Sequence, residues 1–233
     1  MRRAVLVLVA VLLVAGCGGG KKAVTTVETV KLPTTTTSGD PGKDAIGAFV
    51  SAAKAWKLGA MWGMLSSESK QRVGPTLGEF KSGAGGELAD TLAGFGDYKV
   101  IVSERLTPEF GIVGIDDGKQ VYAVPLRLEG TDWRVELGSP VKIRPLGPLP
   151  GKTEDVVAQI GAAVEGPGGE VNVVMYRDGA TEQPQVRGTA TDVTTFANFD
   201  PALPGGRHSV VVAATEGREA GATAWVFTVR KGR

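Results

Sequence analysis

The spacing of hydrophobic residues changes along this chain of 233 residues, and each pattern predicts a different kind of structure. Residues 4–15 are apolar without a break. Between residues 43 and 95 the apolar positions recur every three or four residues, which is typical of helices that bury one face. From Tyr98 onward apolar and polar residues alternate in short runs, which indicates β-strands.

Several short helices are expected in the helical region. The first opens near Asp40-Pro41, where Asp40 or Asp44 is a suitable N-cap. Its apolar face comprises Ile46, Phe49, Val50, Ala53 and Trp56. Shorter pieces are expected over residues 60–65 and from Ser66 to about residue 73. Thr76 to Glu79 fits a capping box for a further helix, which the glycines at 83, 85 and 86 weaken or break.

The strands fall into two groups on either side of the stretch RPLGPLPG at residues 144–151, which marks a domain boundary. The first group is expected at residues 98–106, 111–115, 120–128 and 133–143. The second is expected at residues 156–164, 171–177, 185–187, 193–199, 209–215 and 223–230. Helices followed by an antiparallel meander predict an α+β fold, with helices packed on an antiparallel sheet. Six or seven short strands in about 80 residues predict an all-β sandwich after it.

The apolar stretch at the N-terminus has the layout of a secretory signal peptide. Arg2 and Arg3 precede it and Gly16 follows it. Its twelve residues are too few for a transmembrane helix, which needs about 20. The run Val14-Ala15-Gly16-Cys17 resembles a bacterial lipobox. That resemblance implies cleavage between Gly16 and Cys17 and a diacylglyceryl group on the Cys17 sulfur, which would anchor the protein outside the cytoplasm on the bacterial cell membrane.

These patterns divide the chain into five expected parts. Residues 1–16 are the lipoprotein signal peptide, and residues 17–42 are the lipidated cysteine with a tether rich in Thr, Gly and Pro. As a flexible coil the tether would average roughly 25–30 Å end to end. Residues 43–147 form the α+β domain, residues 148–152 a Pro/Gly linker, and residues 153–233 the sandwich.

Charge and composition limit the classes of partner, metal and cofactor that are expected. Loss of Arg2 and Arg3 changes the formal charge from +1 to −1 (1 − 2), which argues against nucleic acid as a partner. Cys17 is the only cysteine and His208 the only histidine, so neither a multi-histidine metal site nor a cofactor is expected. His208 is expected to be structural, on a sandwich strand. Asp116-Asp117-Gly118 lacks the other ligands of a calcium loop and is expected to be a turn.

The first domain resembles the nuclear transport factor 2-like fold, in which helices close a curved antiparallel sheet into a cone. The residues that carry the resemblance are Ala45-Ile46, Phe49-Val50, Ala53, Trp56, Gly59 to Trp62, Leu65-Ser66, Glu68 to Lys70, Glu79-Phe80 and Trp133 to Val135. Within that fold they are similar to the non-catalytic N-terminal domain of methicillin-resistance-type penicillin-binding proteins. The chain departs from this family at Leu58-Gly59, where an acidic residue is usual, and no transpeptidase domain follows.

The second domain resembles bacterial immunoglobulin-like modules. Tyr176 to Gly179 is similar to a strand and its turn. Leu203 to Val210 and Trp225 to Val229 are similar to the closing hairpin of such a module. The resemblance implies a binding or display domain.

A cone-shaped domain offers one place for a pocket, and five aromatic residues are its candidate lining. They are Trp56, Trp62, Tyr98, Tyr122 and Trp133. Asp97, Glu104 and Asp132 lie at strand ends or beside turns, where carboxylates are usually solvated, so no catalytic residues are expected. The expected function is non-enzymatic binding at the cell envelope, to a cell-wall polymer or an envelope protein, with the oligomeric state open. The alternative is a small-ligand carrier or an enzyme that uses the cone cavity.

Overall fold

The computed structural model describes residues 40–189 and 192–231, so the predictions for Gly16, Cys17 and the tether up to residue 39 lie outside the described residues. Five helices come first: α1 (Pro41–Lys54), α2 (Leu58–Gly63), α3 (Ser67–Val73), α4 (Leu77–Ser82) and α5 (Ala84–Ala93). The side chain of Asp40 caps α1 by accepting hydrogen bonds from the backbone N–H groups of Gly42 and Lys43. The capping box of Thr76 and Glu79 is present, and Gly83 separates α4 from α5, as the sequence predicts.

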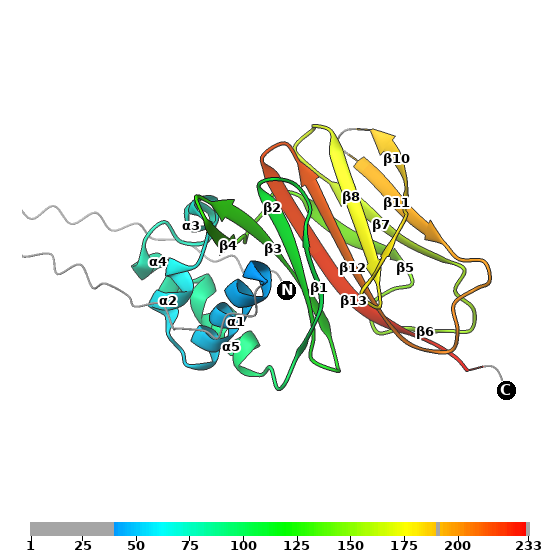
Figure 1. The fold of residues 1–233 in the computed structure, drawn as a ribbon, viewed down its shortest axis with the longest axis horizontal. Coiled ribbons are helices and arrows are strands. Elements are labelled where there is room, and N and C mark those ends of the chain that lie inside the picture. The colour runs from blue at the N-terminus through cyan, green and yellow to red at the C-terminus, as the bar shows by residue number, and fades with distance from the viewer. Residues whose placement is uncertain (1–39, 190–191, 232–233) are drawn as a thin grey trace, which may run out of the picture.

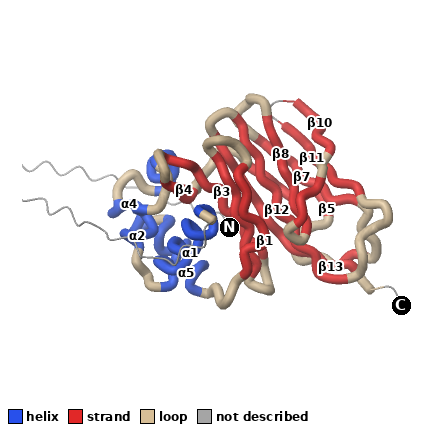
Figure 2. The backbone as a smooth tube through the Cα atoms, in the orientation of Figure 1, coloured by secondary structure: helices blue, strands red, loops and turns tan. Residues whose placement is uncertain are grey.

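A four-stranded antiparallel sheet follows, which we call the helix-facing sheet. Its strands are β1 (Lys99–Arg105), β2 (Phe110–Asp116), β3 (Val121–Glu129) and β4 (Asp132–Val135), paired in that order. Asp117 accepts hydrogen bonds from the N–H groups of Lys119 and Gln120, which makes the predicted turn between β2 and β3. The α+β class with antiparallel sheets is therefore confirmed (Figure 2).

The remaining strands form two further sheets. The outer sheet contains β5 (Lys142–Gly147), β7 (Gln159–Glu165), β10 (Gln185–Thr189) and β11 (Asp192–Asn198), in the order β10-β11-β7-β5. The central sheet contains β6 (Thr153–Glu154), β8 (Val171–Arg177), β9 (Ala180–Glu182), β12 (Gly206–Glu216) and β13 (Glu219–Val229), in the order β6-β13-β12-β8-β9. Figure 1 shows the layers in sequence: helices, helix-facing sheet, central sheet and outer sheet.

The last strand of the meander differs from the prediction. The expected strand at residues 133–143 is two strands, because Gly138 has a positive φ of 68° and Pro140 follows it. β4 stays in the helix-facing sheet, whereas β5 pairs with β7 in the outer sheet. The chain therefore enters the sandwich between Val135 and Lys142, ahead of the linker expected at residues 148–152.

Both faces of the helix-facing sheet are buried, because its strands present apolar side chains on each side. Val113, Ile115 and Leu126 pack under the helices. Val102 and Ile112 face the central sheet, where they contact a cluster that includes Tyr176 and Val211. A separate core lies within the sandwich; it includes Ile160, Met175, Val210, Trp225 and Phe227. The three cores make the two halves, residues 40–135 and 142–231, one stack of layers.

Candidate functional site

A partly buried cluster of charges joins the two halves at one end of the helix-facing sheet. This ionic cluster consists of Glu68, Arg72, Arg127, Glu136 and Glu219. Glu136 is 1% exposed and stands at its centre. Its carboxylate accepts hydrogen bonds from Arg127 Nε at 3.0 Å, Arg72 Nη1 at 2.9 Å and the Ser66 hydroxyl at 2.5 Å.

The ionic cluster reaches into the sandwich through both arginines. Arg127 Nη2 donates to the backbone carbonyl of Arg218 at 2.7 Å, and Arg72 Nη2 donates to Glu219 Oε2 at 2.6 Å. Burial lowers the pKa of Arg127, but hydrogen bonds and charge from Glu136, together with the charges of Glu68 and Glu219, raise it overall. Every charge has a counter-charge, so the cluster is a structural joint. This cluster was not predicted from the sequence, although the charged Arg127 within the apolar run of β3 was a signal.

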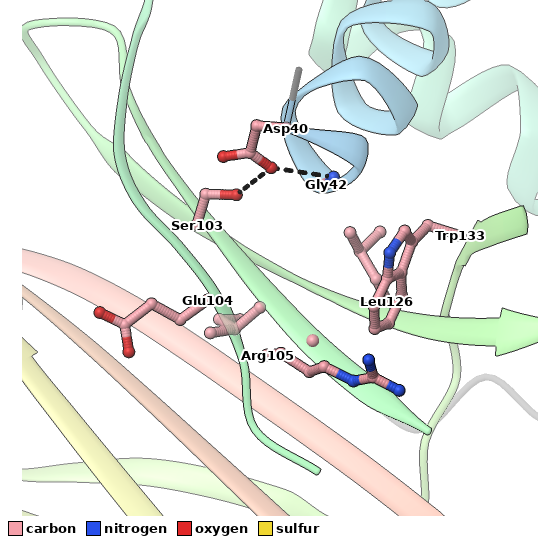
Figure 3. A pocket seen from close by; sticks show the side chains of 9 residues that line it. Asp40, Gly42, Ser103, Glu104, Arg105, Leu126 and Trp133 are labelled. Atoms are coloured by element: carbon pink, nitrogen blue, oxygen red, sulfur yellow. Dashed lines mark hydrogen bonds between the residues drawn. The ribbon is translucent and has the colours of Figure 1, made fainter. Parts of the chain in front are cut away.

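A small cleft lies beside the N-terminus of α1 (Figure 3). Its volume is about 260 Å³, and Asp40, Arg105 and Trp133 form three of its sides. Asp40 Oδ1 accepts from the Ser103 hydroxyl at 2.9 Å, and the Arg105 guanidinium lies 5.8 Å from the Trp133 ring centre. Burial raises the pKa of Asp40, but hydrogen bonds from the Lys43 N–H and the Ser103 hydroxyl hold it below its usual value.

The polar groups of this cleft already have protein partners. The Arg105 guanidinium donates to the backbone carbonyls of Thr107 and Pro108, which fixes it over the β1–β2 turn. Glu104 points away from Trp133 and accepts a hydrogen bond from Tyr176 of the central sheet at 3.0 Å (Figure 3). The cleft therefore offers an aromatic edge and a charged rim, with its carboxylate engaged in capping α1.

A second hollow, which we call the β3 groove, runs along the outer edge of β3 and has a volume of about 340 Å³. One wall consists of apolar side chains from α1 and α5, including Phe49, Val50, Leu88 and Leu92. The opposite wall is Ala222, Thr223 and Ala224 of β13. Val121 to Val124 form the side between them. Its lining contains neither a carboxylate nor a basic side chain.

The five aromatic residues proposed for a common pocket lie in separate places. Tyr122 lines the β3 groove and packs on Phe95, with ring centres 4.4 Å apart. Trp133 lines the cleft. Trp62 donates from its indole to the Gly74 carbonyl at 2.9 Å, with the Lys70 ammonium 4.7 Å from its ring centre. The two remaining residues are Trp56, which is 51% exposed, and Tyr98, whose pKa is raised by burial.

His208 lies at the start of β12 and has two hydrogen-bond partners. Its Nε2 is 2.8 Å from the Pro204 carbonyl and its Nδ1 is 2.8 Å from Asp178 Oδ2. Asp178 and Gly179 form the predicted turn between β8 and β9, with φ values of 52° and 83°. The side chain of His208 thus joins the β8–β9 turn to the loop between β11 and β12.

Among residues 40–189 and 192–231, no three His, Cys, Asp or Glu side chains are placed to hold a metal ion. None of the helices described there is long and apolar enough to cross a bilayer.

The strand order of the sandwich identifies its type. Outer strands β5, β7, β11 and β10 occupy the places of strands A, B, E and D of an immunoglobulin-like sandwich, and β13, β12, β8 and β9 those of G, F, C and C′. His208 stands where such domains have a tyrosine that bonds to the backbone a few residues upstream.

Known proteins offer only distant likenesses. No known family and no curated protein sequence matches the chain. Among solved structures, titin M4 is 13% identical with a TM-score of 0.26 over 40% of this chain and 98% of that chain. A titin M10 complex with obscurin-like 1 is 21% identical with a TM-score of 0.28 over 41% and 99%. The titin tandem A164–A165 is 8% identical with a TM-score of 0.27 over 60% and 84%. None carries an argument about what this chain does.

Proposed function

We propose that this protein is a lipoprotein of the bacterial cell envelope, held outside the cytoplasm by acyl chains on Cys17, with a binding or adaptor role. The observation that carries the proposal is the run from Met1 to Cys17: two arginines, twelve apolar residues and a small residue precede the only cysteine of the chain. A disulfide within the chain would need a second cysteine. Two acyl chains supply the two membrane signals that stable anchoring requires.

In this proposal the helical half is a nuclear transport factor 2-like domain. Helices on one face of an antiparallel sheet support it, as do the residues similar to the N-terminal domain of penicillin-binding proteins. That resemblance alone suggests the partner class, a cell-wall polymer or a protein of wall synthesis, and it is an argument by analogy. The three stacked sheets support a binding role, since a tether can present such a stack outside the membrane.

The anchor is tested by replacing Cys17 with serine in the native host. The variant is expected to leave the membrane fraction and to lose the mass of the acyl groups, whereas Gly18→Ser, a control one residue away, keeps both. The proposal fails if Cys17→Ser still sediments with membranes and is cut at the same bond. Crosslinking from the cell surface, followed by identification of the captured species, then separates a wall polymer from a protein partner.

A small-ligand carrier or cavity enzyme is the alternative, and the apolar lining of the β3 groove is the observation in its favour. The protein purified from its host would then carry an apolar molecule that organic extraction releases and mass spectrometry detects. Substitution of Ala123 by leucine is expected to lower the amount carried, while the exposed Val186→Leu serves as control.

A further inference from the structure

The outer edge of β3 is only partly covered. β4 pairs with β3 from Leu126 to Glu129, and the Glu136 N–H then donates to the Pro125 carbonyl at 2.9 Å. Among the described residues, no strand pairs with Val121 to Val124 on that side. An open edge of this kind accepts an additional strand through its backbone groups.

The register shows which backbone groups are open. The Leu128 N–H donates to the carbonyl of Glu109, the residue before β2. The backbone N–H and C=O groups of alternate β3 residues therefore face β2, and those of the residues between them face outward. Pro125 is one of the outward residues, because its carbonyl bonds to Glu136. Ala123 and Val121 share its orientation, so their N–H and C=O groups point into the β3 groove.

The opposite wall of the groove is a second open edge. Gly151 N–H bonds to the Val226 carbonyl and Thr228 N–H to the Lys152 carbonyl, which covers the outer side of β13 near its end. Ala222 and Ala224 have the same orientation, and no strand described here pairs with them on that side. Their methyl side chains and that of Ala123 leave room for a neighbouring backbone.

We propose that the β3 groove accepts a β-strand and that its occupant is Ala23 to Val27 of the same chain. This stretch reads Ala-Val-Thr-Thr-Val, with β-branched residues at four of five positions and charges only at its flanks, Lys22 and Glu28. As a strand it would place Val24 and Thr26 on one face and Ala23, Thr25 and Val27 on the other. Both faces suit a groove lined by apolar and small side chains. A small apolar molecule would leave the open backbone groups of Ala123 unpaired.

The connection is long enough. Ile46 lines the groove six residues beyond Asp40, a distance of about 9 Å along α1. Residues 28–39 connect the proposed strand to Asp40, and twelve residues span up to about 40 Å when extended. Only Gly18 to Lys22 would then separate Cys17 from the docked strand, so the groove would lie close to the membrane while it is occupied.

Amide exchange at Ala123 tests the proposal in the mature chain with Cys17 replaced by serine, so that failure of the anchor and failure of the strand are distinguishable. We expect Ala123 to exchange about tenfold more slowly in this parent chain than in its Val27→Asp variant, as it would if about 90% of molecules had the groove occupied. A carboxylate at Val27 would have to be buried without a partner, which displaces the segment. Thr36→Asp adds the same charge outside the segment and should leave Ala123 protected. The Val113 amide, inside the sheet, reports whether each variant is folded.

Four results would overturn the proposal. Equal exchange of Ala123 in the parent and in Val27→Asp would show that the segment does not cover the edge. Loss of protection in Thr36→Asp as well would assign the effect to charge alone. Protection that rises with protein concentration would place a second copy in the groove. Protection unchanged by Val27→Asp but removed with an extracted apolar molecule would make the groove a ligand site.

Discussion

Two of the contacts between the halves of the molecule have opposite chemistry. Between the helix-facing and central sheets the contact is apolar and spread over many side chains, among them Val102, Ile112 and Val211. At the end of the sheet it is the ionic cluster, in which one carboxylate, Glu136, receives bonds from two arginines and a serine. Loss of one apolar contact leaves its neighbours in place, whereas loss of one charge leaves its partners buried without it. The apolar contact should therefore tolerate the loss of a single side chain without separating the two halves. In the ionic cluster, the effect of removing one charge should depend on whether the others are present.

The largest effect is expected from Glu136→Gln, which keeps the shape of the side chain and removes its charge. Arg72 and Arg127 then share a buried site with one carboxylate fewer, so the free energy of unfolding should fall by about 3 kcal/mol, near the lower end for a broken buried pair because Glu68 and Glu219 remain. Urea denaturation measures it. The control is Glu165→Gln, in a surface pair with Arg144 whose side chains are 55% and 60% exposed, where we expect less than about 0.5 kcal/mol.

A double-mutant cycle between Glu136→Gln and Arg127→Met sharpens the comparison. If the cluster acts as a unit, the second change adds much less than it does alone, and the coupling energy reaches about 1–3 kcal/mol. Simple additivity of the two losses would contradict interdependence.

In the apolar contact, Ile112→Ala is expected to lower the free energy of unfolding by about 2 kcal/mol, because Ile112 is 1% exposed and its truncation leaves a cavity between two sheets while its apolar neighbours stay in place. Thermal and urea unfolding should still be cooperative, with the two halves melting together. The matched control is Val186→Ala on β10, where the side chain is 47% exposed and the change should be within about 0.5 kcal/mol. Separate melting of the two halves in Ile112→Ala would show that the apolar contact does not tolerate the loss of a single side chain.

Tyr176→Phe probes the one polar bond described within the apolar contact, from the Tyr176 hydroxyl to Glu104. Because the acceptor is a carboxylate, its removal should lower the free energy of unfolding by about 1.5 kcal/mol at neutral pH. Burial, then the hydrogen bond to Glu104 and its charge, raise the pKa of Tyr176, so its contribution is present below the ordinary tyrosine pKa of about 10 and is lost as pH rises above it. Stability measured from neutral to alkaline pH should therefore fall less steeply for Tyr176→Phe than for the parent; equal slopes would refute the assignment.

Neither contact between the halves was predicted from the sequence, whereas local structure was. The pattern at residues 111–115 predicted a strand, which is part of β2; the burial of β2 on both faces from Phe110 to Ile115 was not predicted. Local signals such as the capping box of α4 and the turn at Asp178-Gly179 were also sufficient, because each depends on a few adjacent residues. These features follow from short-range spacing.

Long-range pairing was harder to predict. The ionic cluster joins Arg72, Arg127 and Glu219, residues from three separate segments, and no spacing in the sequence brings them together. β5 continues the apparent meander in sequence but pairs with β7, since Gly138 and Pro140 turn the chain away. The β3 groove exists because β4 is short and stops pairing at Leu126. The five candidate residues are all aromatic but do not lie together. The spacing of apolar residues shows which side of a helix or strand a residue occupies, but it does not show which sides pack against each other.

The smallest effect is expected at a third, solvent-exposed link between the halves. Arg207 of β12 binds Asp116 of β2 through two bonds of 2.7 and 2.9 Å. Burial raises the pKa of Asp116, but the hydrogen bonds from Arg207 and the Gly118 N–H and the charges of Arg207 and Lys99 lower it overall. A carboxyl whose pKa is lowered on folding stabilises the protein above its unfolded pKa of about 3.9, and that contribution disappears as pH falls through the folded value.

Asp116→Asn should therefore lower the free energy of unfolding by about 1 kcal/mol at neutral pH, since Arg207 is 37% exposed and water screens the pair. The difference from the parent should shrink below about pH 4 and vanish at the acid end of a urea-denaturation series. Asp155→Asn, in a pair with Arg230 whose side chains are 75% and 68% exposed, should change stability by less than about 0.5 kcal/mol at every pH. A loss of stability in Asp116→Asn that does not depend on pH would mean that the shape of the side chain, rather than its charge, holds this link. The link would then not count among the ionic contacts between the halves.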